Sequence, residues 1–178
     1  MIRALLFLPL ALLVACRPGP ANAPESTAPE SESAPRQVAP VDTYFPLQVG
    51  ERLTNVQLAI TDTEMATGLM HRQNMPEHDG MIFVFAQPRP QRFWMRNTYI
   101  PLDIAYITPD GVIQEIHQME PLDESGAPSS RADIQFALEM NQGWFEAYGV
   151  EVGDQIDLRQ LASHVHARGF DSETITVQ

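Results

Sequence analysis

Residues 80–106, GMIFVFAQPRPQRFWMRNTYIPLDIAY, are the part of the chain that decides its fold. A continuous apolar run, 81–85, is followed by a Pro-, Arg- and Gln-rich loop, a short apolar run, 93–95, and a polar corner, Arg96-Asn97-Thr98. A third apolar run, 100–107, comes after the corner. A short apolar run that ends in turn residues is typical of a strand buried on both faces. The stretch therefore predicts core strands, and the polar corner between them is the first candidate for a functional site.

Further strands and two helices are predicted around this stretch. Apolar and polar side chains alternate with a period of two, which indicates strands with one buried face, in residues 56–60, 112–119 and 132–140. Thr61 and Glu64 have the spacing of a capping box. Asn141 is expected to cap a second short helix, which Gly149 ends. We expect a mainly β (β-rich α+β) fold: a single compact domain with a bent sheet or a partly closed barrel and two short helices.

The first sixteen residues carry the signs of export. Residues 4–14 are apolar and follow Arg3, and they are too few to span a bilayer. The tetrapeptide Leu-Val-Ala-Cys that ends at Cys16 resembles the lipobox of bacterial lipoprotein signal peptides, and Cys16 is the single cysteine of the chain. This resemblance implies cleavage before Cys16 and its acylation, with palmitate as an expected acyl group. The alternative is an ordinary secretory signal peptide in which Cys16 is incidental.

The 178 residues divide into four predicted parts. We expect a lipoprotein signal peptide over residues 1–15, and over 16–40 the lipidated cysteine and a disordered tether. Pro, Ala, Ser and Glu dominate the tether and bury too little surface to order it. The globular β-rich domain is expected over 41–160. Residues 161–178 are predicted to be a loosely ordered C-terminal tail, with a possible short strand at 173–177.

Charge and the predicted lipid together indicate the partners. The formal net charge of −12 opposes a nucleic-acid partner, because proteins that bind phosphate backbones present basic patches. Several acyl chains on Cys16 would anchor the protein stably to the cell envelope. Arg17 follows Cys16 where many Gram-negative lipoproteins retained in the inner membrane have Asp, which favours the periplasmic face of the outer membrane. The expected partners are thus the membrane and a small ligand or envelope protein whose identity the sequence does not specify.

Several segments carry a family resemblance. They are G-M-I-F-V-F, F-W-M-R-N-T and I-P-L-D within 80–103, T-E-M-A-T-G-L-M-H-R at 63–72, A-L-E at 137–139 and G-V-E-V-G-D at 149–154. Together they resemble domain-of-unknown-function family 192, also called uncharacterised protein family 0127, over roughly residues 49–158. The resemblance implies a compact, mostly β domain that is often exported. It implies no established activity.

Asp103 is the first candidate site residue, because its strand neighbours Leu102 and Ile104 are apolar and a buried carboxylate needs partners. In one interpretation it accepts backbone N–H groups from the Asn97-Thr98 turn and only braces the corner. In the other it belongs to a ligand pocket, since small-ligand sites combine an apolar wall with a few convergent polar groups. The ligand-binding residues of that pocket would be Arg72, Trp94, Asn97, Thr98 and Asp103.

Glu139 supports an alternative function of another class. It interrupts an apolar strand, and with Asp103 it would form a general acid–base pair of an envelope hydrolase or transferase. Asp103 acting with Arg72 is a variant of the same hypothesis. The sequence contains no G-x-S-x-G, H-E-x-x-H or C-x-x-C motif, so no known enzyme class is recognised.

A third hypothesis rests on thioether and imidazole groups, which are dense just before the central stretch. Thioethers suit Cu(I), so a periplasmic Cu(I)-binding protein would use Met70, His71, Met75 and His78. Methionine also fills irregular cores, which explains the same residues without a metal. We predict no cofactor.

Overall fold

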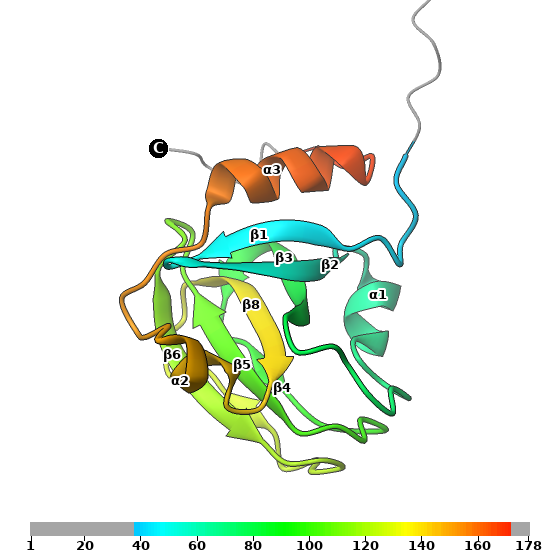
Figure 1. The fold of residues 1–178 in the computed structure, drawn as a ribbon, viewed down its shortest axis with the longest axis vertical. Coiled ribbons are helices and arrows are strands. Elements are labelled where there is room, and N and C mark those ends of the chain that lie inside the picture. The colour runs from blue at the N-terminus through cyan, green and yellow to red at the C-terminus, as the bar shows by residue number, and fades with distance from the viewer. Residues whose placement is uncertain (1–37, 172–178) are drawn as a thin grey trace, which may run out of the picture. The chain divides into compact units, whose positions relative to one another are not determined.

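The computed structural model describes residues 38–171 (Figure 1). The predicted signal peptide, Cys16, most of the tether and the possible strand at 173–177 lie outside these residues. The elements are β1 (Phe45–Val49), β2 (Arg52–Ala59), α1 (Asp62–Thr67), β3 (Asp79–Arg89), β4 (Arg92–Phe93), β5 (Leu102–Ile107), β6 (Ile113–Met119), β7 (Ala127–Pro128), β8 (Ile134–Asn141), α2 (Trp144–Tyr148) and α3 (Leu158–Ala167). None of the helices in this part of the chain is long and apolar enough to cross a membrane.

Six strands form one mixed sheet in the order β1-β2-β3-β8-β5-β6, and β4 pairs with β7 in a separate two-stranded ribbon. β2 and β3 run parallel, and α1 lies in the crossover that such a pair requires. The sheet bends: β1 and β2 run beneath α3, whereas β5, β6 and β8 are steeply inclined to them (Figure 1). The prediction of a β-rich domain with a bent sheet is confirmed, and the sheet does not close into a barrel.

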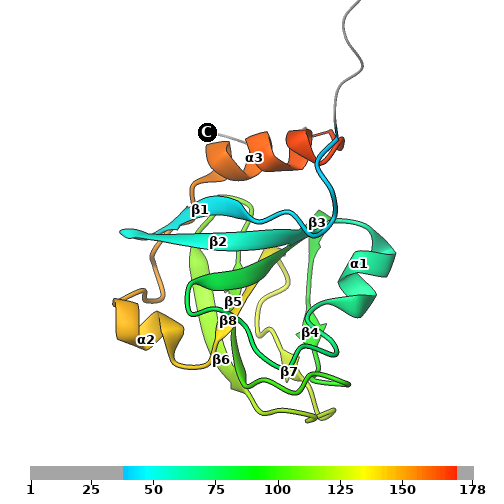
Figure 2. The ribbon, with the colours of Figure 1, turned by 45° about the vertical axis from the view of Figure 1, so that its right-hand side comes forward.

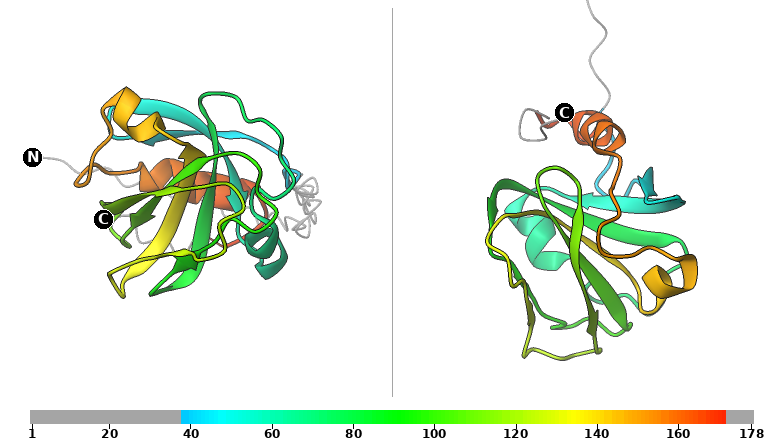
Figure 3. Two further views of the ribbon diagram at one scale, coloured as in Figure 1. Left: turned by 90° about the horizontal axis from the view of Figure 1, so that it is seen from below. Right: turned by 90° about the vertical axis from the view of Figure 1, so that its left-hand side faces the viewer.

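Two apolar clusters cover the two faces of the sheet. α2 and α3 pack on one face through Trp144, Phe145, Leu161 and Val165. α1 and the β4–β7 ribbon cover the opposite face, and Figure 2 shows α1 and α2 on opposite sides. The right-hand view of Figure 3 shows the bent strands between these layers. Because both faces are covered, all six residues of β5 are buried, and its sequence is a nearly continuous apolar run.

The two predicted helices form, with one correction. Thr61 and Glu64 make the predicted capping box at the start of α1. Gly149 ends α2 with a left-handed φ of 65°, as expected. Asn141, however, does not cap α2: it ends β8, and its side-chain amide donates to the backbone oxygen of Pro76 at 2.9 Å. The α2 cap is Gly143, which tolerates the left-handed φ of 81° found there.

The expectation of a loosely ordered tail from residue 161 is wrong for the residues of α3. Asp157 caps this third helix by accepting from the backbone N–H of Arg159 at 2.9 Å. Leu161 and Val165 are buried against β1 and β2. Just beyond the helix, Arg168 donates to the backbone oxygen of Leu58 at 2.9 Å and pairs with Glu64. The helix therefore belongs to the domain core.

Candidate functional site

A hollow of about 290 Å³ opens on the α1 side of the sheet. We call it the Glu139 hollow. Its walls come from α1 and the turn after it, from β3 and from the segment around β4, and its floor comes from β8. The apolar part of the lining includes Met65, Leu69, Phe83, Phe85 and Phe93. The site is thus a recess of mixed polar and apolar lining, with several aromatic side chains, between a helix and the central strands.

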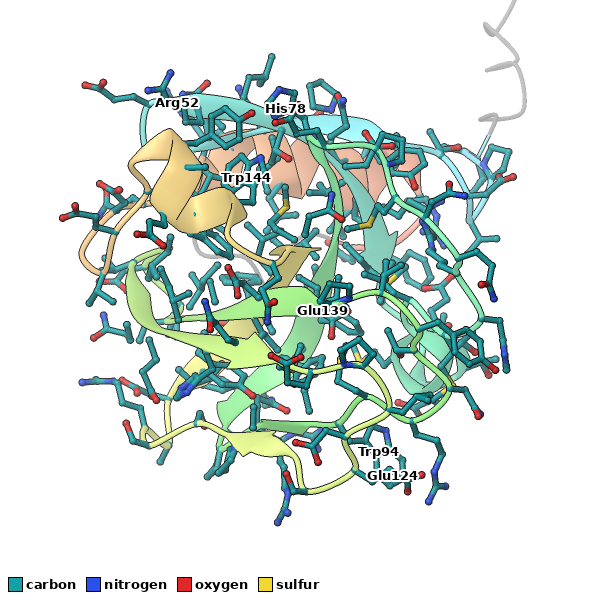
Figure 4. The ribbon with its side chains drawn as sticks, turned by 60° about the horizontal axis from the view of Figure 1, so that its bottom comes forward. Arg52, His78, Trp94, Glu124, Glu139 and Trp144 are labelled. Carbon is teal, nitrogen blue, oxygen red and sulfur yellow. The ribbon has the colours of Figure 1, made fainter. Side chains whose placement is uncertain are left out.

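Glu139 is the buried acid of this hollow. Its side chain lies between Met81 of β3 and Ile104 of β5 and is 4% exposed. Figure 4 shows Glu139 over the central strands, with Trp94 nearer the edge. Burial raises the pKa of the Glu139 carboxyl to about 8, although the nearby charge of Arg72 favours ionisation. Glu139 is therefore mostly protonated at pH 7, and a protonated carboxyl donates as well as accepts.

Gln91 is the second buried polar residue in the lining. It is 8% exposed, and its amide nitrogen Nε2 has no hydrogen-bond partner within the part of the chain that the structure describes. Its backbone is held by Ser129: the N–H of Gln91 donates to Ser129 Oγ at 3.0 Å, and its carbonyl accepts from the N–H of Ser129 at 2.8 Å. An unpaired buried donor costs about 1–3 kcal/mol, so its presence needs an explanation.

Basic and aromatic side chains surround the mouth of the hollow. Arg89 and Arg92 are exposed in its lining. Trp94 is 47% exposed, and the guanidinium carbon of Arg96 lies 4.1 Å from the centre of its ring. Arg96 also pairs with Glu124 at 2.9 Å, so its guanidinium group contacts both Trp94 and Glu124. The exposed charged groups in the lining of the hollow are thus two arginines, Arg89 and Arg92, and one acid, Asp62.

The structure brings part of the predicted pocket together. Trp94 and Thr98 line the Glu139 hollow. Arg72 is not in the lining, but its charge acts on Glu139, and it donates to Tyr44 Oη at 2.7 Å. Asn97 is exposed in a left-handed conformation with φ 55°, and its carbonyl accepts from the N–H of His71 at 2.7 Å. Asn97 shapes the corner without reaching the hollow.

Asp103 lies on the opposite face of the sheet from Glu139. In the β5–β8 register Asp103 faces Met140, whereas its neighbour Ile104 faces Glu139, and successive side chains of a strand point to opposite faces. The two carboxyls therefore form no acid–base pair, and Arg72 lies on the Glu139 side. The expectation that Asp103 braces the Asn97-Thr98 turn is also wrong: its Oδ2 accepts from the N–H of Gly143 at 2.7 Å.

The four candidate Cu(I) ligands have different surroundings. Met70 lines the Glu139 hollow, and Met75 packs against the apolar cluster beneath α1. His71 is exposed, while Nδ1 of His78 accepts from the indole N–H of Trp144 at 3.3 Å (Figure 4). Among residues 38–171, no three His, Cys, Asp or Glu side chains are grouped so that they could hold a metal ion.

Sequence reasoning missed Gln91 and the aromatic walls. Gln91 follows a Pro-Arg-Pro segment that reads as an ordinary polar loop, so no local pattern distinguishes it. Glu139 was found because an acid interrupts an apolar strand. Its real surroundings depend on strand pairing with β3 and β5, which are distant in sequence.

Comparison with known proteins identifies the family. Residues 45–158 match the profile of the family described as DUF192, Uncharacterized ACR. The chain belongs to the DUF192 family. The matched range contains every residue named above for the lining of the Glu139 hollow. Tyr44, which accepts a hydrogen bond from Arg72, lies one position before the range.

Two solved structures resemble this DUF192 protein. One, from Novosphingobium aromaticivorans DSM 12444, is a protein of unknown function with 33% identity and a TM-score of 0.63, covering 75% of this chain and 99% of that one. The other, from Sinorhizobium meliloti 1021, is described as a candidate transcription regulator; it has 34% identity and a TM-score of 0.61, covering 65% of this chain and 93% of that one. No curated protein matches the chain.

Proposed function

We propose that this DUF192 protein is a lipid-anchored envelope protein whose domain binds a small, mostly apolar molecule with acceptor oxygens, such as a carboxylic acid, in the Glu139 hollow. The observation that carries the proposal is the convergence of two buried polar groups on one recess. Glu139 and Gln91 are both buried in its lining, and Nε2 of Gln91 has no partner among the described residues. A ligand that accepts from both groups would satisfy both.

The hydrogen-bond donors that line the Glu139 hollow indicate which polar group the ligand carries. A protonated Glu139 carries an O–H donor, and Nε2 of Gln91 carries N–H donors. Arg89 and Arg92 at the mouth add donors with positive charge. These donors complement the oxygen atoms of a carbonyl or carboxylate, and two arginines against one exposed acid, Asp62, favour an anionic ligand over a cationic one.

The walls specify the rest of the ligand. Phe93 lies edge to face against both Phe83 and Phe85, with ring centres 4.7 Å and 6.4 Å apart, respectively. Aromatic walls with a few polar groups are typical of small-molecule sites, and the hollow of about 290 Å³ is at the small end of their range. A ligand with a single ring or a short acyl chain fits these dimensions.

The description of the S. meliloti relative as a candidate transcription regulator does not extend well to this chain. A formal net charge of −12 repels the phosphate backbone. We therefore retain an envelope location, for which the support is the apolar leader, the lipobox-like residues ending at Cys16 and the Pro-rich segment after them.

Labelling with a radioactive or alkynyl palmitate tests the anchor. We expect the native chain expressed in a Gram-negative host to incorporate the label and to fractionate with outer membranes. The Cys16→Ser variant should lose both the label and the membrane association. Equal labelling of the two proteins would contradict lipidation at Cys16.

A second candidate function is general acid catalysis by Glu139, favoured by its pKa of about 8 in an aromatic recess. It would make the same hollow a substrate site. Hydrolysis of a carboxylic ester by the native protein, absent from Glu139→Gln, would establish catalysis in place of simple binding.

The binding proposal is tested by NMR titration of the isotope-labelled domain, residues 38–178. The Novosphingobium chain is matched over 99% of its length by 75% of this one, so a domain of this extent folds by itself. The probes are benzoate, phenylacetate and hexanoate, each beside the amine of matching carbon skeleton. We expect the acids to shift the amide signals of Glu139 and Gln91, and the amines to leave them unchanged.

Two variants locate the binding. Gln91→Ala removes one donor and should weaken the binding of the acids by roughly tenfold, which is the effect of losing one hydrogen bond to a charged group. Glu51→Gln changes an exposed acid in the β1–β2 turn and should bind like the native domain. Shifts of the Glu139 and Gln91 amide signals that the amines cause more strongly than the acids would overturn the proposal. Binding of the acids that Gln91→Ala leaves unchanged would also overturn it.

A further inference from the structure

A second hollow lies on the other face of the sheet and is not used by the proposed function. It measures about 400 Å³ and is formed by β5, β6, α2 and residues 149–152. Its apolar part comes from Ile116, Phe145 and Val150, and its polar part includes Asp103, Glu146 and Glu151. We call it the Asp103 hollow. None of the residues that line it is basic.

Asp103 is the distinctive group of this hollow. The residue is 3% exposed, yet it belongs to the lining. Its Oδ2 accepts from the N–H of Gly143 at 2.7 Å, while its buried Oδ1 has no hydrogen-bond partner among residues 38–171. A buried carboxylate oxygen without a donor is unfavourable, so this oxygen is an unused acceptor beside an open recess.

The surrounding charge favours a cation. Glu146 and Glu151 are exposed at the rim, and no basic side chain in the lining neutralises the three acids. Burial and the charge of Glu146 raise the pKa of Asp103, while the Gly143 N–H lowers it. A bound positive group with an N–H donor would relieve both the repulsion among the carboxylates and the unmet acceptor.

We propose that the Asp103 hollow binds the primary ammonium group of a small aliphatic amine. An N–H of the ammonium donates to Oδ1 of Asp103, Glu146 and Glu151 contribute long-range attraction at the rim, and the alkyl chain lies on Ile116, Phe145 and Val150. A metal ion fits less well, because residues 38–171 group no three His, Cys, Asp or Glu side chains for coordination. The inference is independent of the Glu139 hollow, which has the opposite preference.

Titration of the domain with four small probes tests this site. n-Butylammonium carries charge and N–H donors, 1-butanol lacks the charge, tetramethylammonium lacks the donors, and putrescine adds a second ammonium. We expect n-butylammonium and putrescine to shift the amide signal of Gly143, whose N–H shares the carboxyl with the ligand. 1-Butanol and tetramethylammonium should leave it unchanged at the same concentrations.

Three variants complete the experiment. Asp103→Asn removes the charge and should weaken the binding of n-butylammonium by roughly tenfold or more. Glu146→Gln, at the exposed rim, should weaken the binding of n-butylammonium by about twofold to threefold and reduce the salt dependence of that binding. Asp42→Asn, an exposed acid in the turn before β1, should bind like the native domain.

Equal binding of 1-butanol and n-butylammonium to the native domain would overturn the inference, as would an ammonium-induced shift confined to signals away from Gly143. Both comparisons use native protein, so they decide the matter even when Asp103→Asn does not fold. Unchanged affinity in a folded Asp103→Asn domain would equally exclude Asp103 as the receptor.

Discussion

Glu139 couples the stability of the domain to pH. Its ordinary pKa of 4.5 is raised to about 8 in the folded protein by burial. Between these values the folded state holds a proton that the unfolded state has lost, so the free energy of unfolding decreases as pH rises, by at most about 1.4 kcal/mol per pH unit. Above pH 8 both states are ionised and this contribution stops changing.

Glu139→Gln should remove this dependence, because the amide cannot ionise. We expect the variant to exceed the native domain in free energy of unfolding by on the order of 4 kcal/mol at pH 9, with the difference disappearing near pH 4.5. Urea denaturation at pH 5, 7 and 9 measures it. Glu51→Gln serves as the exposed control. If the free energies of unfolding of the native domain and of Glu139→Gln differ by the same amount at every pH, the result would contradict the burial of Glu139.

At the residue scale the sequence identifies the important acids but not their neighbours. Asp103 and Glu139 both stand out because each interrupts an apolar strand. Their assignment to opposite faces depends on a register in which Ile104 faces Glu139. Gly143, which donates to Asp103, is forty residues away in sequence. Local patterns contain no information on contacts of that kind.

Among the secondary-structure elements, the close approach of β3 and β8 requires glycine at position 80. The Asp79-Gly80 pair resembles a turn, yet Gly80 lies in β3 opposite Met140 of β8. A Cβ at Gly80 would lie 2.4 Å from the backbone oxygen of Glu139. That contact is too short to be relieved by a side-chain rotation, so the strands must separate.

Gly80→Ala should therefore cost about 3 kcal/mol of stability through overpacking and displace the floor of the Glu139 hollow. Gly153→Ala is the matched control: its Cβ meets nothing within 4 Å, so only its left-handed φ of 103° is penalised, by about 1 kcal/mol. Thermal or urea denaturation compares the two. Equal losses would show that the approach of β3 to β8 is not tight.

α3 is a helix that the sequence pattern did not predict. Leu158, Leu161 and Val165 have helical spacing, but polar and histidine residues separate them. The helix becomes favourable through packing on β1 and through the contact of Arg168 with Glu64 and the Leu58 carbonyl. Tertiary contacts of this kind outweigh weak local propensity.

Leu161→Ala should accordingly lower the free energy of unfolding by about 3 kcal/mol, the usual cost of truncating a fully buried leucine. Ser163→Ala on the exposed side of the helix should change it by less than about 0.5 kcal/mol. Denaturation of both variants measures the difference. A loss in Leu161→Ala as small as that in Ser163→Ala would mean that α3 is not part of the cooperative core.

At the scale of the whole molecule, the bent sheet separates two chemically different surfaces. The face beneath α1 presents a protonatable acid and an amide donor among aromatic rings, and the face beside α2 presents unneutralised carboxylates. The β-rich class and most strands were predictable because central strands buried on both faces leave long apolar runs. The division of polar residues between faces was not predictable, since a shift of one residue in register would reverse it.

Direct titration of the Glu139 side chain tests whether a buried, protonated carboxyl group receives the ligand in the Glu139 hollow. The carboxyl carbon of Glu139 is followed by ¹³C NMR from pH 4 to pH 10, in the free domain and with phenylacetate, and assigned with Glu139→Gln. We expect a midpoint near pH 8 in the free domain and a higher midpoint with phenylacetate bound, because binding favours the protonated donor. A midpoint near the ordinary 4.5, unchanged by phenylacetate, would contradict this expectation.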